Sequence, residues 1–492
     1  MASLSLFDWL VVAGYLLGMV ALGVTLARRG ETFDDFFLAG RALTAPILIA
    51  TLVSSYYGID VLFGSSQLAF SEGVVAWFGY ARPAYLFFLV AAFLVAGRLR
   101  EHDFRSLPDI LGRFYGPGAS TAGAIASFLY SLPALSLYGF GVLGTVLLEW
   151  PPALSMVLFG GIALVYTLTG VFRAVVITDS IQFLIMCLVL AMAVPYALAL
   201  IGGFDAMFTV LEPSYFDTLG GLSTWLIFVY AATNLVILVE PAFYQRIFAS
   251  RSAAAVRNAL LIGILLWGAY DWVVTILGMA ARTAVAQGAL GGEVAADHAL
   301  VTIMIGVLPM GALGFFVAGI LATEMSTLDS YSLVAGGNVA YDLYRPLVRP
   351  EASDAELVRL TRIGIVVAWV VGFAVALFFE QMLGLWVFMA SILISTVLVP
   401  ILLGLFIPSW RRPRAGLYAS VLGLATVLIA NGVVVLLGAY SEEQETFVYT
   451  VRAAGASFEI WQEHAMLFGV PASLAGFFVG LALDSTEGGS RA

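Results

Sequence analysis

The sequence of 492 residues carries little charge and no lysine. Only 11% of its residues are charged and 61% are apolar, whereas a soluble protein of this size usually carries about 25% charged residues. This composition excludes an ordinary soluble enzyme. Apolar runs of about 18 residues or more recur along the whole chain, which is typical of a polytopic membrane protein.

The missing residue types exclude further classes of function. All 22 basic residues are arginine, so a covalent mechanism through a lysine Schiff base is impossible. The net charge of -10 argues against a nucleic-acid partner, which would require a basic face. The single cysteine, Cys187, leaves no disulfide within the chain. No catalytic motif of a membrane enzyme is found, and neither an enzyme nor an obligate protein partner is indicated.

Hydropathy predicts an all-α protein with thirteen transmembrane helices, because a span needs about 20 apolar residues. The predicted spans are 6–28, 44–70, 76–98, 118–148, 151–170, 174–201, 224–247, 258–284, 310–338, 361–380, 383–406, 415–438 and 464–484. No hydrophilic stretch is long enough for an appended domain, so residues 1–492 are expected to form a single transmembrane domain.

Arginine distribution predicts the orientation of these spans. Nineteen arginines, Arg246 among them, fall in one set of connectors, and only Arg82, Arg282 and Arg452 lie elsewhere. Because cytoplasmic loops are enriched in basic residues, we expect the N-terminus outside and the C-terminus in the cytoplasm. An odd number of spans gives the same result.

Two of the predicted spans are interrupted near their middles. The second contains Gly58 among polar residues, and the seventh contains the pair Glu240 and Pro241. Interrupted helices at corresponding positions of two halves mark the binding site of an inverted-repeat transporter. Residues 44–201 would form the first repeat and 224–406 the inverted second, flanked by helices at 6–28 and 415–484. The alternative is two unrelated kinks in packed helices.

The ninth span carries a stripe of hydroxyl groups. Thr323, Ser326, Thr327 and Ser330 fall on one helical face. Hydroxyl and carbonyl oxygens of this face and of a broken neighbour would suit an alkali cation. The alternative is close helix packing with hydroxyls bonded to their own backbone.

Five short motifs in order resemble the sodium:solute symporter family. They are FFLAGR (36–41), LPDILGRFYG (107–116), ITDSIQ (177–182), QRIFASRS (245–252) and ATEMSTLDS (322–330). The resemblance covers nearly the whole chain. It implies a five-plus-five inverted-repeat fold with broken helices 2 and 7, a multi-pass protein of the plasma (inner) membrane, and uptake of a small polar solute by alternating access, coupled to sodium as the co-transported ion.

The resemblance also assigns site residues. The principal sodium site would use carbonyls of Ser54, Tyr57 and Thr323 and hydroxyls of Ser326 and Thr327. Some members hold a further sodium at a buried aspartate, and the residues for that site here are Asp179, Ser326, Asp329 and Ser330. A different reading of Asp179 is a carboxylate near a helix start that pairs with Arg173 or with backbone amides.

The solute pocket is expected between the broken spans and the third span. The candidates by position are Tyr56, Asp60, Arg82, Asn234, Glu240 and Tyr244, with Asp271 and Glu324 as candidates for coupling. Arg82 would extend toward the membrane surface, pair with Asp60 or Glu240, or bind a solute carboxylate.

Four acids at mid-membrane positions favour a cationic or zwitterionic, amino-acid-like solute. They are Asp60, Glu240, Asp271 and Glu324. The alternatives are a proton-coupled or metal-ion carrier on the same fold and, more remotely, a transporter-like sensor or receptor.

Overall fold

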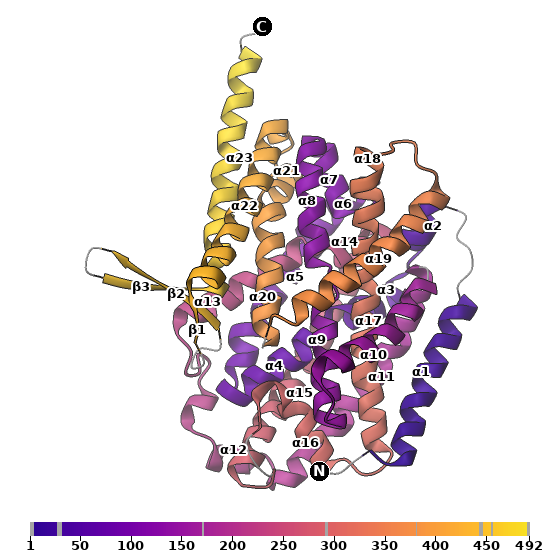
Figure 1. Ribbon diagram of the computed structural model, residues 1–492, viewed down its shortest axis with the longest axis vertical. Coiled ribbons are helices and arrows are strands. Elements are labelled where there is room, and N and C mark those ends of the chain that lie inside the picture. Colours follow the sequence, from indigo (N-terminus) through magenta and orange to yellow (C-terminus); the bar gives the residue numbers. More distant parts are fainter. Residues whose placement is uncertain are drawn as a thin grey trace.

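The protein is a bundle of long helices with a small sheet at one flank, as a computed structural model shows (Figure 1). The structure describes residues 4–26, 32–169, 172–290, 294–379, 381–441, 446–453 and 456–489. Helices α1 and α23 lie on opposite flanks of the bundle (Figure 1).

The α-helices follow the predicted spans closely. Those of the first half are α1 (Leu6–Leu26), α2 (Phe33–Leu38), α3 (Ala45–Tyr56), α4 (Ile59–Glu72), α5 (Arg82–Val90), α6 (Ala96–Arg100), α7 (Leu107–Tyr115), α8 (Pro117–Tyr130), α9 (Ala134–Leu148), α10 (Pro152–Thr169), α11 (Phe172–Ile201) and α12 (Phe204–Val210). Those of the second half are α13 (Thr224–Thr233), α14 (Pro241–Ala249), α15 (Ala253–Ala286), α16 (Ala299–Val307), α17 (Ala312–Gly337), α18 (Arg345–Leu347), α19 (Asp354–Ala376), α20 (Met382–Leu393), α21 (Val399–Phe406), α22 (Pro413–Leu437) and α23 (Ala465–Gly489). Short π-helical segments at η2 (Ala76–Ala81), η3 (Ala91–Val95), η7 (Asn338–Tyr344) and η8 (Ile394–Leu398) join some of them.

Eleven helices of the described residues are long and apolar enough to cross a membrane, and twelve if the bent pair α3 and α4 counts as one span. The fifth predicted span corresponds to α10, which is a shorter apolar helix. The count of thirteen and the orientation therefore stay predictions.

The first interruption separates α3 from α4. The two helices are bent by 51°, and Tyr57 ends α3 while Gly58 begins α4 in an extended conformation. The carbonyl of Gly58 accepts from the backbone N–H groups of Val61 and Leu62, at 3.2 and 3.1 Å. The break thus lies where the sequence predicts it.

The second interruption separates α13 from α14 by the 3₁₀ turn η5 (Asn234–Leu238) and two further residues. Glu240 is the N-cap of α14, and Pro241 follows at the first helical position. Proline suits that position because its missing N–H would have no helical partner there.

Close contacts lock the broken spans and the N-terminal helix into the bundle. A Cβ atom added at Gly278 of α15 would lie 2.6 Å from the carbonyl oxygen of Ser66 in α4, so only glycine allows this approach. In α1, the Asp8 carboxylate accepts from the backbone N–H groups of Gly311 and Gly314, at 2.7 and 2.8 Å. Asp8 therefore caps the start of α17 and holds α1 against it.

A polar connector between α6 and α7 is fixed by an ion pair to α2. Arg105 donates to the Asp34 carboxylate at 2.5 Å. The Asp34 carboxylate keeps the pKa of the Arg105 guanidinium above its ordinary value. This pair ties the segment after the third span to the segment before the second.

Hydropathy did not predict a three-stranded antiparallel sheet between α22 and α23. Its strands β1 (Ala439–Ser441), β2 (Thr446–Ala453) and β3 (Ala456–Trp461) pair in sequence order. The expectation of a purely α-helical chain is wrong at this point. The run TFVYTVRA is rich in β-branched and aromatic residues, which favours a strand, but a search for apolar stretches of span length passes over it.

Candidate functional site

A buried carboxylate, Asp179 of α11, lies where α3, α14 and α17 meet. It is 0% exposed. It accepts hydrogen bonds from Thr51 of α3 at 2.5 Å, from Ser326 of α17 at 2.8 Å and from Arg246 of α14 at 3.0 Å. One ionised side chain thus joins four spans, two of them the interrupted ones.

Arg246 completes this network, and its burial was not predicted from the sequence. It is 1% exposed and forms an ion pair with Asp179, whereas the arginine count used it only as one of the cytoplasmic-side arginines. Asp179 therefore has Arg246 as its buried partner, and Arg173, the partner in the alternative reading, is exposed. Arg246 is the sixth residue of α14. At about 1.5 Å per residue it lies roughly 9 Å beyond the break, so it is still inside the bundle.

The predicted principal sodium residues lie directly beside this network. The hydroxyl oxygens of Ser54 in α3 and Ser326 in α17 are 2.5 Å apart. The Thr327 hydroxyl donates to the carbonyl of Thr323 at 3.1 Å, one turn away on the same helix. Tyr57 is the C-cap of α3, and its hydroxyl donates to the Trp267 carbonyl at 2.7 Å. The broken span and the hydroxyl stripe are thus in contact.

Residues assigned to a second sodium are only partly brought together. Arg246 donates to Ser330 at 2.7 Å and to Asp179 at 3.0 Å, so its guanidinium bridges the two. The Asp329 carboxylate instead accepts from the Thr167 hydroxyl of α10. Asp329 therefore faces a different neighbour from Asp179.

Three small cavities lie near the centre of the bundle, and two of them are lined by residues of both interrupted spans. Each has a volume of ≈20 Å³, which is room for about one water molecule. All three share Tyr331 of α17, and aromatic side chains dominate their walls. The aromatic lining residues are Tyr56, Tyr80, Tyr85, Phe88, Tyr130, Phe243, Trp267, Tyr331 and Trp386.

Three predicted solute residues line these cavities. Tyr56 lines two of them and packs against the stacked rings of Phe88 and Trp267. Asn234 lines one of these two, while its amide donates to the carbonyl of Tyr80 at 2.9 Å. Glu240 lines the first cavity.

The other predicted solute residues lie elsewhere. Arg82 is exposed, with its guanidinium 5.2 Å from the centre of the Phe78 ring, so it follows the outward alternative and does not pair with Glu240. Tyr244 is fully buried and donates to the Leu238 carbonyl, where it spans the second break. The Asp60 side chain falls outside the described residues.

Glu240 caps the start of α14. Its two carboxylate oxygens accept from the backbone N–H groups of Ala242, at 3.0 Å, and of Phe243. These are the first free donors of α14, so the start of this half-helix is already capped by an acid of the chain itself.

Asp271 of α15 differs from the other buried acids. It is 4% exposed and lines the cavity that also contains Tyr56, Tyr85 and Asn234. One oxygen accepts from the Tyr85 hydroxyl, and the Tyr57 hydroxyl, which donates to the Trp267 carbonyl, also lies beside the carboxylate. The other, Oδ1, has no hydrogen-bond partner within the described part of the chain. Glu324 is also buried, on α17, but it does not line these cavities.

Apart from Tyr56, the aromatic lining residues were missed because their spacing gives no signal. Aromatic residues make up 13% of the chain, and nothing in their spacing distinguishes Tyr85, Trp267 or Tyr331 from those in the helix packing. The break positions could have directed attention to Tyr85 and Trp267, which lie on the spans next to the two broken ones.

Solved transporters share this fold. A sodium-coupled sialic acid symporter aligns with a TM-score of 0.78 at 15% identity, covering 97% of this chain and 98% of the other. A nucleobase-cation-symport-1 family transporter aligns with a TM-score of 0.55 at 16% identity, covering 93% and 96%. The chain therefore has the inverted-repeat fold of these transporters, with its paired helix breaks.

The chain belongs to the sodium:solute symporter family, whose model matches residues 36–423. It is 28% identical to the osmoregulated proline transporter of Bacillus subtilis (84% of this chain, 87% of the relative) and 29% identical to the sodium/proline symporter of Escherichia coli (74% and 75%). It is 24% identical to the human high affinity choline transporter 1 (76% and 67%).

This membership and the shared fold confirm the predicted family, the mostly helical inverted-repeat fold and the sodium-coupled transport function. The protein is a sodium-coupled symporter of the plasma membrane, with a small molecule as its solute and sodium as the co-transported ion, and it is not an enzyme.

Proposed function

We propose that this symporter imports a small solute with a positively charged nitrogen, either zwitterionic and amino-acid-like or cationic, together with one sodium ion. The observation that carries the proposal is Asp271. Its Oδ1, which accepts no hydrogen bond within the described residues, is buried at the wall of an aromatic cavity between the two helix breaks.

The solute argument follows from the chemistry of this wall. A buried carboxylate oxygen without a donor is costly, and a protonated or quaternary amine would compensate its charge. Tyrosine rings around it, including Tyr56 and Tyr85, attract cations through their faces.

A solute that is recognised mainly through its own carboxylate has less support. A solute carboxylate would favour a free helix N-terminus, but Glu240 already caps α14. The names of the relatives agree, because proline is a zwitterion and choline a cation.

For sodium we propose the oxygens between α3 and α17. These are the carbonyls of Ser54, Tyr57 and Thr323 and the hydroxyls of Ser326 and Thr327. The short separation of Ser54 and Ser326, 2.5 Å, supports this site, because an ion there would connect the broken span to the ninth span. The Asp179 carboxylate, one hydrogen bond away, adds negative charge nearby.

We further propose that Arg246 takes the place of a second sodium ion. Its guanidinium already lies between Asp179 and Ser330, which are two of the four residues assigned to that ion. A positive charge fixed there by the chain makes a second cation unfavourable, so uptake should depend on sodium with a Hill coefficient near one.

In the transport cycle, bound sodium would hold the second, third, seventh and eighth spans against the fourth, fifth, ninth and tenth. The solute would then bind at the breaks before the inner path opens. Because the central cavities are each about the size of one water, solute binding requires these two groups of spans to move apart. One charge crossing 100 mV supplies about 2.3 kcal/mol and a tenfold sodium gradient about 1.4 kcal/mol.

A thermal-shift screen of the purified protein tests the solute class. L-proline and choline would be compared with glucose and with a simple carboxylate, each with and without sodium. We expect stabilisation by a charged-nitrogen solute only in sodium. Sodium-dependent stabilisation by glucose or by the carboxylate alone would refute the proposed class, and uptake in sodium-free buffer at several pH values would reveal proton coupling.

The sodium site is tested by the double substitution Ser326→Ala with Thr327→Ala. We expect it to abolish sodium-stimulated uptake while the protein still folds. Ser332→Ala is the matched control, because Ser332 is buried on the same helix outside the hydroxyl stripe. If the double variant keeps the sodium dependence of the wild type, the site lies elsewhere.

A further inference from the structure

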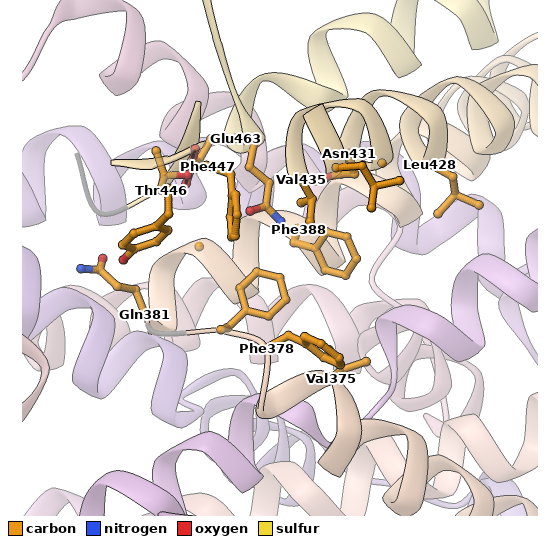
Figure 2. A pocket seen from close by; sticks show the side chains of 16 residues that line it. Val375, Phe378, Gln381, Phe388, Leu428, Asn431, Val435, Thr446, Phe447 and Glu463 are labelled. Carbon is orange, nitrogen blue, oxygen red and sulfur yellow. Dashed lines mark hydrogen bonds between the residues drawn. The ribbon is translucent and has the colours of Figure 1, made fainter. Parts of the chain in front are cut away.

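A second and much larger cavity lies away from the transport path. It has a volume of ≈610 Å³ and is bounded by the ends of α19, α20 and α22 and by the start of the sheet (Figure 2). Volumes of this size are typical of sites for small molecules. None of its lining residues is shared with the three central cavities, so its occupant would not be the transported solute in its binding site.

The walls of this cavity are largely aromatic. Rings of Phe378, Phe388 and Phe447 face its interior, with Val435 on the α22 side (Figure 2). Phe378 is 81% exposed at the rim, which gives a ligand an apolar entrance. Such walls suit a ligand with an aromatic ring.

Two polar side chains in the cavity offer acceptors. Asn431 is 4% exposed, and its amide nitrogen donates to the Val427 carbonyl at 2.9 Å, while Oδ1 has no partner within the described residues. The Glu463 carboxylate accepts from the Thr446 hydroxyl at 2.9 Å. No ion pair among the described residues includes Glu463. The lining therefore presents an amide oxygen and a carboxyl group at opposite sides of the ring cluster (Figure 2).

We propose that this cavity is a second ligand site, which binds an arylalkylamine. The aromatic ring would pack among the phenylalanines and the ammonium group would donate to the Glu463 carboxylate, a charge-assisted hydrogen bond. Asn431 Oδ1 would accept from a donor on the ring end. The site also touches the transport machinery, because Gln381 in its lining accepts from the Gln67 amide of α4 at 3.0 Å.

The test measures binding by calorimetric titration, with the full chain in lipid nanodiscs. The probes are a matched pair, 4-phenylbutylamine and 4-phenylbutan-1-ol. We expect saturable binding of the amine and much weaker binding of the alcohol. Glu463→Gln should weaken amine binding about ten- to a hundredfold, as expected for a lost hydrogen bond to a charged group, and leave the alcohol unchanged. Val435→Trp, which fills the cavity without changing its charge, should remove binding of both.

Two outcomes would overturn the proposal. If Asp271→Asn abolishes amine binding while Glu463→Gln and Val435→Trp keep it, the amine occupies the transport site instead. If binding does not saturate and is equal in all variants, the amine merely partitions into the bilayer. Val435 lies on a partly exposed helix face, so Val435→Trp should still fold. This variant therefore tests the proposed cavity even if Glu463→Gln folds poorly.

Discussion

Two buried aspartates, on neighbouring long helices, have opposite surroundings. Asp179 of α11 accepts from Thr51, Ser55, Ser326 and Arg246. Asp271 of α15 accepts from the Tyr85 hydroxyl, and its Oδ1 has no hydrogen-bond partner in the described part of the protein. Both are nearly inaccessible to solvent, at 0% and 4% exposure.

The difference separates a structural carboxylate from one that is available to a ligand. Removing a carboxylate from water is costly unless charges and donors compensate it. At Asp179 the protein supplies that compensation itself, and the same contacts join four spans. At Asp271 the compensation is incomplete, so a cationic ligand that supplies it gains binding energy there.

The largest expected effect is the loss of stability on substituting Arg246, the partner of Asp179. Arg246→Met removes the buried cation but keeps a long apolar side chain, and leaves Asp179 buried without its counter-charge. Breaking a buried pair in this way costs about 3–5 kcal/mol. Unfolding of the purified variant, followed by heat or denaturant, should show that loss of stability.

Arg251→Met serves as the matched control, because Arg251 is exposed and its guanidinium donates to the backbone carbonyl of Ala42 at 3.0 Å. It should change the free energy of unfolding by about 0.5 kcal/mol or less. Adding Asp179→Asn to Arg246→Met should recover part of the stability, since the unpaired charge is then gone. Equal stability of Arg246→Met and Arg251→Met would show that the buried pair does not hold the spans together.

Substituting Asp271 should give the reverse pattern, a loss of solute affinity with little loss of stability. Asp271→Asn keeps the shape and the Tyr85 contact but removes the charge. We expect solute affinity to fall about ten- to a hundredfold, the value of a hydrogen bond to a charged group, with little change in stability. Uptake kinetics and thermal unfolding on the same preparation measure both quantities. A variant that unfolds readily yet binds solute normally would place Asp271 with Asp179 as a structural group.

Local patterns let the sequence predict much of this arrangement. The breaks at Gly58 and at Glu240–Pro241, and the stripe containing Ser326, depend on residues close together in the chain. The structure then brings Ser54 and Ser326 into contact. The family and the coupling ion were also predicted correctly from short motifs, because these lie at fixed places along the whole chain.

What the sequence could not predict depends on three-dimensional placement. The depth of Arg246 follows from where α14 begins, and an arginine count assigns it to a loop. The large cavity is formed by segments up to 88 residues apart, from Val375 to Glu463, together with a sheet that hydropathy does not detect. The Arg82 side chain is exposed, although its position in the span is compatible with all three of the placements considered from the sequence.

Glu240 is a third buried carboxylate, to be compared with Asp179 and Asp271. Its substitution has the smallest expected effect on stability. Its partners are backbone N–H groups at the start of α14, so its contribution is that of a helix cap. Glu240→Ala should cost about 1 kcal/mol of stability, whereas Glu240→Gln keeps a capping oxygen and should lose less. Because Glu240 also lines a central cavity, solute affinity and the pH profile of uptake must be measured in Glu240→Gln as well. A loss of affinity as large as that of Asp271→Asn would group Glu240 with the ligand-binding carboxylate. Unaltered affinity and pH profile would remove it from the solute pocket and leave it, like Asp179, as a group that holds the broken span in place.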